Sequence, residues 1–457
     1  MTLIIVLLLL LSYLLIATTH LTGVNKAAIA TFLAAAGWVV YICWGTDFVM
    51  KLHPGAYAEF LGNMDASSQN VKNFIYDSIF LKYVGKAAAV VMYLLATMSV
   101  IEILNNNGCL DFISEWIRTR NPNRLLWTIT LATFILSANL DNLTTTIVML
   151  VIMHSIVKSR PQRMLIGSAI VLAATCGGCF TVIGDPTGLI LWGNEAVTAT
   201  NFSSYLALPA IVAWVLPTVL IGRQLPSRLE IEWGGAPFRG DDTRLNRWQR
   251  LLMLFVAIGG LWFVPTFLSI TRLPAFLGAM VVLSLLWVVN EAFNRKLMNA
   301  DQMSQRRIPR VIQYEAIQQM LFVMGIMLGI GVIAETGVLT DVADWIDTTI
   351  DNLWIVGVLS GLLSSLVDSF TIAMSDIALY DIWNAGDYAQ NGAYWKVVAY
   401  CTAVGGCLLS VGSACGMALM KMEHVHLGWY FKNITVKVLL GWLAGLGILW
   451  IECFLYP

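Results

Sequence analysis

Long apolar segments separated by short polar loops run along the whole chain. Eight of them are about 16 to 22 residues long, which lets an α-helix cross a hydrocarbon core of roughly 30 Å. These segments are 3–18, 26–47, 84–104, 205–222, 250–270, 273–291, 314–334 and 434–455. The pattern predicts an all-α polytopic membrane protein. The first segment lacks a basic leader and a clear cleavage site, so we interpret it as a retained helix rather than a signal peptide.

Four further apolar segments are interrupted near their middle. Two of them are too long for a single span and contain one aspartate each, and the other two contain Gly-rich runs. The first pair is 125–157, with Asp141, and 352–381, with Asp368; the second pair is 164–198 and 395–422. Glycine and proline unwind a helix in a membrane and expose its backbone carbonyls. The sequence therefore predicts two re-entrant hairpins, or short helix pairs, and two broken helices.

The two halves of the chain match each other at an offset of 227 to 229 residues. Ser137 and Asp141 in the first half match Ser364 and Asp368 in the second, and the paired glycines of the interrupted segments match as well. Such an ordered series indicates an internal repeat. We predict a first membrane repeat at 1–222, a cytoplasmic linker at 223–249 and a second membrane repeat at 250–457.

Charge indicates that the two repeats are inverted. Arginines and lysines flank segment 125–157, whereas no basic residue lies between Arg310 and Lys396, where acidic residues flank segment 352–381. Basic loops stay on the cytoplasmic side, so the hairpins are expected to enter the membrane from opposite faces. Counting the membrane spans alternately from these basic loops places both termini, and a long loop at 48–83, on the outside of the membrane. Segments 110–120 and 340–350 are amphipathic and are expected to lie along the membrane interface.

Composition excludes several classes of function. The chain is 58% hydrophobic and 12% charged, and its net charge of −1 argues against a nucleic-acid partner. It lacks a phosphate loop and the common hydrolase motifs, so we predict neither nucleotide binding nor an enzyme, and no cofactor. The eight cysteines lie mostly within apolar segments and are interpreted as packing residues. Glu423, His424, His426 and His154 are interpreted as solvated groups at the cytoplasmic side.

Three aspartates at membrane depth need an explanation, because a charged carboxylate there costs several kcal/mol. Asp141 is followed by an amide and three hydroxyls, and Asp368 by two hydroxyls. These are hard oxygen ligands that suit an alkali or alkaline-earth cation rather than zinc or copper. The candidate ion-binding residues are Asp141, Asn142, Thr144, Thr145, Asp185, Thr187, Asp368, Ser369 and Thr371, with Na⁺ at Asp141 and Asp368. Secondary candidates are Ser410 and Ser413 in the second broken helix, and Glu102 and Glu335 as gates or solvated groups.

Three motifs carry a resemblance to a known family. Asp141–Met149, Ile183–Trp192 and Gly412–Met420 resemble the NhaD-type sodium/proton antiporters of the ion-transporter superfamily. The resemblance covers nearly the whole chain from about position 80. It implies a homodimer in a bacterial inner membrane, with a scaffold part, a moving transport part that shifts like an elevator, and a role in pH homeostasis.

The resemblance also implies roles for single residues. Asp141 with Asn142, and Thr144 with Thr145, correspond to the family's first hairpin. Asp185 and Thr187 correspond to its Gly-Asp-x-Thr segment, and Asp368 to the aspartate of its second hairpin. Four positions depart from the family pattern. Gly188 and Leu189 stand where further threonines are expected, Ser369 where asparagine is usual, and Thr371 where proline is expected.

These observations favour exchange of Na⁺ or Li⁺ for H⁺ through competition at Asp141 and Asp368, with Asp185 as a third titrating or field-shaping group. Burial raises the pKa of a carboxylate and a nearby cation lowers it, so a proton and Na⁺ exclude one another. The alternative with the same architecture is a transporter of an anion such as a dicarboxylate or arsenite. An intramembrane aspartyl protease and a passive channel are more distant alternatives.

Overall fold

The structure is a computed structural model that describes residues 2–455 apart from 63, 111–118, 120, 228–229, 231–244 and 295–309. These described residues are almost entirely helical and contain no strand. Eight helical stretches among them are long and apolar enough to span a membrane: Lys26–Cys43, Ser68–Asn106, Arg160–Phe180, Ala199–Gly222, Arg247–Thr271, Ala275–Phe293, Ala316–Ala334 and Leu427–Leu455. The prediction of an all-α, multi-pass membrane protein is confirmed.

The N-terminal region differs from its prediction. Segment 48–83, expected to be a loop, contains α4 (Gly45–Leu52), α5 (Pro54–Leu61), α6 (Ser68–Phe74) and a π-helical turn (Ile75–Phe80) that leads without a break into α7 (Leu81–Asn106). Val71, Phe74 and Ile75 are buried, and two polar residues separate Val71 from the other two. The mean hydropathy of such an amphipathic segment is low, because apolar and polar residues cancel in the average. The predicted span therefore began at residue 84, whereas the helical stretch begins at Ser68.

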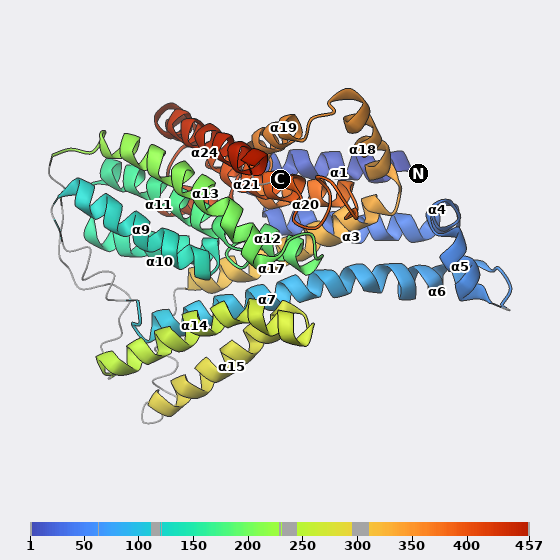
Figure 1. Cartoon of the computed structure of the whole chain (residues 1–457), viewed down its shortest axis with the longest axis horizontal. Coiled ribbons are helices and arrows are strands. Elements are labelled where there is room, and N and C mark those ends of the chain that lie inside the picture. Colours follow the sequence, from blue (N-terminus) through green and yellow to red (C-terminus); the bar gives the residue numbers. More distant parts are fainter. Residues whose placement is uncertain are drawn as a thin grey trace.

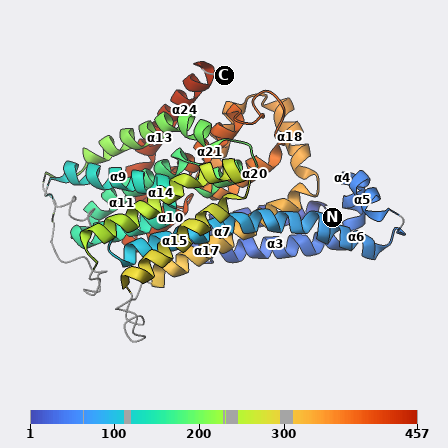
Figure 2. The ribbon, with the colours of Figure 1, turned by 60° about the horizontal axis from the view of Figure 1, so that its bottom comes forward.

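Six helices pack mainly on one another, and we call them the scaffold group. They are α1 (Thr2–Ala17), α3 (Lys26–Cys43), α7, α14 (Arg247–Thr271), α15 (Ala275–Asn294) and α17 (Arg310–Ala334). Figures 1 and 2 show α14 and α15 side by side next to α7. Short α2 (Thr19–Thr22) joins α1 to α3. This group takes helices from both halves of the sequence, so packing does not follow the boundaries of the repeats.

Most of the other helices form a second cluster, the core group, which contains all four interrupted segments. The first hairpin is α9 (Pro122–Asn139) and α10 (Asn142–Ile156), and the second is α19 (Leu353–Leu366) and α20 (Ser369–Leu379). The first broken helix is α11 (Arg160–Phe180) and α12 (Pro186–Gly193); the second is α21 (Ala393–Gly405), a 3-10 turn (Gly406–Leu408) and α22 (Ala414–Glu423). All four interruptions therefore fall within the predicted segments.

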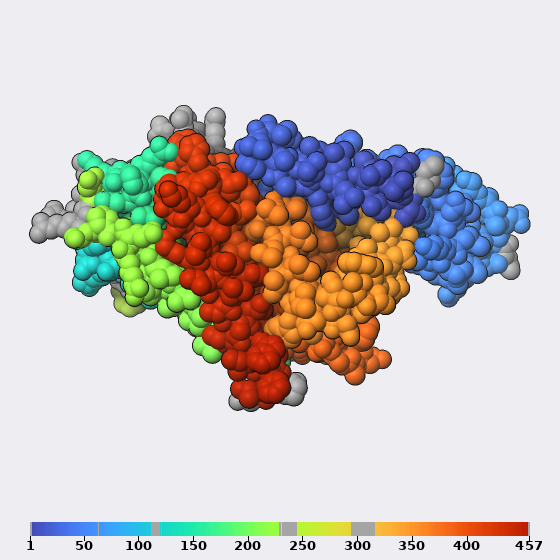
Figure 3. Space-filling model, turned by 90° about the horizontal axis from the view of Figure 1, so that it is seen from above, coloured from blue at the N-terminus to red at the C-terminus, as the bar shows by residue number. Residues whose placement is uncertain are grey.

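Three further elements complete the core group. They are α13 (Ala199–Gly222), which packs on α24 (Val436–Leu455), and the short helical segment formed by α23 (Leu427–Tyr430) and a π-helical turn (Phe431–Thr435) that leads into α24. In Figure 3 the red C-terminal part crosses the molecule between the green helices of the first half and the orange helices of the second.

Equivalent contacts hold each hairpin to its broken helix. The Ser137 hydroxyl donates a hydrogen bond to the carbonyl of Ala174 at 2.6 Å, and the Ser364 hydroxyl donates one to the carbonyl of Thr402 at 3.0 Å. These two pairs occupy matching positions in the two halves. The repeat seen in the sequence is thus a repeat of contacts.

Glycine is required where a broken helix folds back on itself. A Cβ atom on Gly178 would lie 2.8 Å from the carbonyl oxygen of Gly184, and one on Gly406 would lie 2.9 Å from that of Gly412. Real Cβ atoms do not approach that closely, so only glycine allows the backbone to cross at these points. The matching Gly pairs of the sequence are explained by this close approach.

The two ends of the molecule show that the repeats are inverted. At one end, the residues around α10 and α11 meet the end of α22, where Arg163 Nε lies 2.7 Å from Glu423 Oε2. At the other end, the segment after α12 meets the segment after α20, where the Thr198 amide donates to Asn391 Oδ1 at 2.7 Å. The first hairpin therefore opens at one end and the second at the opposite end, as predicted.

The interpretation of Glu423 and His154 as solvated groups is wrong for Glu423. Its side chain is only 1% exposed, and its carboxylate also contacts His154 Nδ1 at 2.7 Å. Sequence position alone placed this acid in a basic loop, whereas the fold turns it inward between the two halves. All eight cysteines are free, and most are buried, in agreement with a packing role.

The structure describes one of the two predicted interfacial segments, but little of the other or of the predicted linker. Segment 340–350 corresponds to α18 (Val338–Thr349), which buries Ala343 and exposes Trp345. Nearly all of segment 110–120, and most of the linker predicted at 223–249, lie outside the described residues.

Candidate functional site

Each interruption in the core group ends in a residue that caps the next helix. Asp141, Asp185, Asp368 and Ser413 are the N-caps of α10, α12, α20 and α22, and each side chain accepts a hydrogen bond from a backbone amide of the first turn. A carboxylate at a helix N-terminus is stabilised by the free N–H groups and by the positive end of the helix dipole. This capping lowers the cost of placing three aspartates between apolar helices.

In the first hairpin, Asp141 uses only one of its two oxygens. Its Oδ2 accepts from the Thr144 amide at 2.9 Å and from the Thr144 hydroxyl at 3.0 Å. Its Oδ1 is buried and has no hydrogen-bond partner, and the same is true of the Thr145 hydroxyl oxygen. Thr145 lies one helical turn after Asp141. The first hairpin thus holds two buried oxygens with unfilled bonding capacity.

Asp185 is joined to the first hairpin by an amide. Its Oδ2 accepts from the Thr187 amide at 3.0 Å, and its Oδ1 accepts from the Asn142 side chain at 2.6 Å. Asp185 also lies within electrostatic reach of both Asp141 and Asp368. The Asn142 side chain thus joins the tip of the first hairpin to the break in the first broken helix, and α12 also packs against α20 of the second hairpin.

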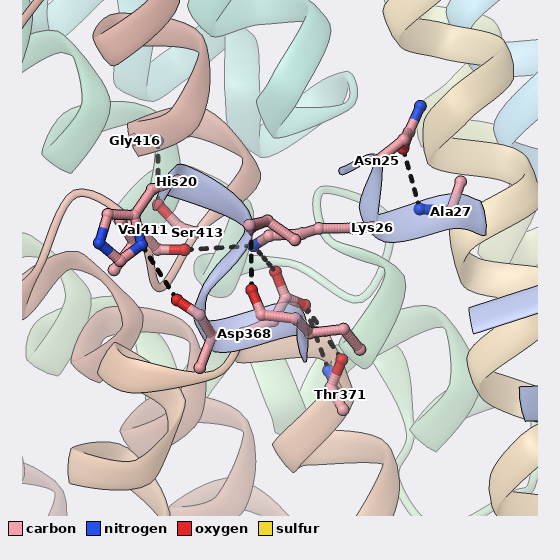
Figure 4. A network of polar contacts seen from close by, with 12 residues as sticks. His20, Asn25, Lys26, Ala27, Asp368, Thr371, Val411, Ser413 and Gly416 are labelled. Atoms are coloured by element: carbon pink, nitrogen blue, oxygen red, sulfur yellow. Dashed lines mark hydrogen bonds and ion pairs between the residues drawn. The ribbon is translucent and has the colours of Figure 1, made fainter. Parts of the chain in front are cut away.

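In the second hairpin, Asp368 is paired with a lysine that the sequence did not single out. Its Oδ2 caps α20 through the Thr371 amide, at 3.3 Å, and its Oδ1 lies 3.0 Å from Lys26 Nζ. Lys26 Nζ also donates to the carbonyl oxygen of Val411, at 3.1 Å, in the unwound segment before α22 (Figure 4). The ammonium group therefore occupies one carboxylate oxygen and one backbone carbonyl.

A cavity of about 320 Å³ gives access to Asp368 between the scaffold and core groups. Its polar lining includes Lys26, Asp368, Gln318, Gln319 and Lys421. Lys421 lies near the end of α22 and Gln318 in the first half of α17. Because the predicted cytoplasmic loops precede α17 and follow α22, the cavity lies toward the predicted cytoplasmic side.

The other predicted candidates have different surroundings. Ser369 donates its backbone amide to the Gly412 carbonyl at 2.8 Å and so joins the second hairpin to its broken helix. The Ser410 hydroxyl contacts the Met420 sulfur, and Ser413 has the capping role described above. Both serines therefore lie in the second broken helix as predicted.

The two glutamates lie in the scaffold group rather than at the breaks. Glu335, just after α17, is held by His53 at 2.6 Å and Tyr83 at 2.9 Å. Glu102 lies in the last two turns of α7. The structure does not bring either residue to the aspartates.

Sequence reasoning missed two charged residues. Lys26 begins an apolar span, where a basic residue is expected at the membrane surface, and nothing in its local pattern indicates a partner 342 positions away. Asp376, on α20, is a further buried acid, and its Oδ2 has no hydrogen-bond partner. Its position two turns after Asp368 within a predicted hairpin was the available signal.

Comparisons with known proteins agree with this architecture. Residues 1–405 match the family described as citrate transporter, CitMHS. Sodium/proton antiporter 1 of Arabidopsis thaliana is 30% identical over 79% of this chain, which spans only 61% of that protein's length. The Na(+)/H(+) antiporter NhaD of Vibrio cholerae is 26% identical, over 79% of this chain and 77% of that antiporter's length. The resemblance to NhaD-type proteins is thereby confirmed.

A solved structure supports the fold independently. The YdaH transporter of Alcanivorax borkumensis, described as having an unusual topology, matches with a TM-score of 0.55 at 14% identity, covering 91% of this chain and 99% of its own. At this identity the likeness concerns the fold alone.

Proposed function

Because this chain belongs to the citrate transporter family, CitMHS, we propose that it is a secondary transporter that exchanges Na⁺ or Li⁺ for H⁺ across a membrane. Relatives over most of the chain carry the names of sodium/proton antiporters, which supports this choice of cargo. In this proposal Asp141 is the primary ion-binding residue, and Asp185 and Asp368 complete the site.

One observation carries the proposal. Asp141 Oδ1 and the Thr145 hydroxyl oxygen are buried without partners in a region that is otherwise well hydrogen-bonded. A buried carboxylate oxygen with no partner costs free energy unless a cation or a proton neutralises it. Both atoms are hard oxygens, the donor type that alkali cations accept. In this proposal Na⁺ takes these unused oxygens as ligands.

Competition follows from the same atoms. If the Asp141 carboxylate carries a proton, it loses the charge that attracts Na⁺, and if it carries Na⁺ the proton is displaced. Only one of the two ions is then bound at a time, which couples their movements in opposite directions. Asp185, linked to the first hairpin through Asn142, is placed to shape the field or to titrate with Asp141.

For the movement we propose that the core group shifts as a body against the scaffold group, in the manner of an elevator. All three aspartates belong to the core group, and the cavity beside Asp368 lies at its boundary with the scaffold group. A homodimer formed through scaffold helices, and a location in a bacterial inner membrane, remain predictions; similar proteins come from bacteria and from a plant.

An anion is the second candidate cargo, because the family description names citrate. The unpartnered Asp141 oxygen disfavours it, since a negative ion beside an uncompensated carboxylate is repelled. Helix N-termini often bind anions, but three of the four N-termini at the breaks are already occupied here by capping aspartates, and Ser413 caps the fourth.

The test is proton flux in proteoliposomes of the purified protein with a pH dye inside, on addition of Na⁺, Li⁺, K⁺ or choline. We expect a pH change with Na⁺ and Li⁺ that is lost in Asp141→Asn and in Asp368→Asn, while both variants remain folded by size-exclusion chromatography. A variant with full transport would disprove its role. No response to any cation, together with uptake of radiolabelled citrate, would favour the anion.

A further inference from the structure

The contact between Lys26 and Asp368 is an ion pair that joins the two helix groups. Lys26 is the first residue of α3, in the scaffold group, and Asp368 caps α20, in the core group. By contrast, the ion pairs of His154 and Arg163 with Glu423 lie within the core group. A movement of one group against the other must break the Lys26 pair.

The pair is built as a defined contact rather than a loose surface pair. The side chains of Lys26 and Asp368 are 15% and 4% exposed. The preceding residue, Asn25, fixes the start of α3 by accepting a hydrogen bond from the Ala27 amide at 2.9 Å, which sets the direction of the Lys26 side chain (Figure 4). Lys421 is the only other charged residue in the described lining of the cavity, and it belongs to the core group.

The ammonium group also takes the ligands that a transported cation would use. Its two acceptors are a carboxylate oxygen of Asp368 and the backbone carbonyl of Val411 in an unwound segment. The matching acid of the first half, Asp141, has no such partner on its Oδ1. The two halves are therefore asymmetric: the first offers free oxygens, whereas a cation fixed to the scaffold fills the second.

We propose that Lys26 is a latch that holds the core group to the scaffold group whenever no transported ion neutralises Asp368. This inference rests on the proposed exchange function and adds to it a device against leakage. An exchanger must not let its empty, negatively charged core return across the membrane, because that step would allow Na⁺ to flow without a counter-ion. Lys26 prevents this return by pairing with the charged, unoccupied Asp368.

The test separates two kinds of ²²Na⁺ efflux from proteoliposomes, at equal alkaline pH on both sides and with the membrane potential clamped by K⁺ and valinomycin. Efflux into Na⁺-containing buffer needs only the loaded core to move. Efflux into Na⁺-free buffer needs the empty core to return. The ratio of net efflux to exchange therefore measures how well the empty core is held.

We expect a low ratio in the native protein, and an increase of at least about fivefold in Lys26→Met, the lower end of typical coupling between sites. Lys26→Arg keeps the charge and should keep the native ratio. A Lys26→Met protein that slows both effluxes equally has lost only structure, and one that leaves the ratio unchanged has no latch; either result overturns the inference. Absence of Na⁺ exchange in the native protein would instead overturn the proposed function.

A second measurement needs no variant. If Na⁺ displaces Lys26 from Asp368, hydrogen–deuterium exchange of the amides in residues 18–28 should become faster in Na⁺ than in choline. Equal exchange rates in the two salts, in protein shown to transport Na⁺, would contradict the latch.

Discussion

In each of the three aspartates, the two carboxylate oxygens have different roles. The Oδ2 atom caps a helix in every case, and the Oδ1 atom is left for a partner that differs: none for Asp141, the Asn142 amide for Asp185 and the Lys26 ammonium for Asp368. Capping stabilises a helix by about 1 kcal/mol, so these residues have a structural role beside their proposed ionic one. Replacing Asp by Asn keeps a capping oxygen and removes the charge, which makes it the appropriate substitution.

The unpartnered hydroxyl of Thr145 leads to a prediction at this scale. Thr145→Val removes the oxygen and nearly conserves the volume, so the KM for Na⁺ should rise about 5- to 30-fold, equivalent to a lost contact of about 1–2 kcal/mol. Thr145→Ser keeps the oxygen and should stay within about twofold of the native KM. The measurement is Na⁺-driven proton flux over a range of Na⁺ concentrations. Equal KM values for Val and Ser would remove Thr145 from the site.

Single residues show where sequence reasoning succeeds. Asp141, Asp185 and Asp368 were found because a charge in an apolar segment is a local signal, visible without a structure. Lys26 was missed because its meaning depends on a partner in the other half of the chain. Glu423 was misjudged for the same reason, since its burial comes from Arg163 and His154 on other helices.

At the scale of elements, the breaks are determined by local chemistry and were predictable. Glycine pairs, a proline after Asp185 and a capping side chain each stop or restart a helix within a few residues. The helical region 48–83 was not predicted, because its helices depend on packing of a few apolar side chains such as Phe74.

The crossing at Gly178 can be tested with a matched control. Gly178→Ala would place a methyl group 2.8 Å from the Gly184 carbonyl oxygen and 3.1 Å from the Asn142 Cβ atom. We expect a destabilisation of about 1–3 kcal/mol, as for other overpacked sites, and weaker Na⁺ transport because Asn142 is displaced. Gly193→Ala meets nothing within 4 Å and should behave like the native protein. The readouts are the thermal unfolding midpoint in detergent and Na⁺-driven proton flux; similar midpoints for both variants would contradict the close approach.

The Glu423 cluster joins helices of both repeats at one end of the molecule. Glu423→Gln leaves Arg163 without its carboxylate partner, so we expect the free energy of unfolding to fall by about 3–5 kcal/mol, as when one partner of a buried pair is removed. His154 is 53% exposed, and His154→Ala should cost less than about 1 kcal/mol. Thermal unfolding of the two variants, side by side in detergent, provides the comparison. Equal stability of the two would show that Glu423 is solvated after all.

For the whole molecule, the internal repeat was readable from the sequence but the two packing groups were not. Matching residues and the distribution of basic loops indicated inversion, because both are properties of the chain order. Division into scaffold and core groups depends on contacts between helices of both halves, such as α3 with α17 and α13 with α24. The position of the Lys26–Asp368 pair at their boundary follows only from that division.

Competition between Na⁺ and a proton at one carboxylate is most directly tested by the pH dependence of the KM for Na⁺ in proteoliposomes. On the acidic side of the site's pKa, one-proton competition predicts that the KM rises about tenfold for each unit of falling pH, while the maximal rate at saturating Na⁺ changes little. The effect should disappear, together with transport, in Asp141→Asn. A KM that stays constant with pH, while only the maximal rate changes, would contradict competition at Asp141.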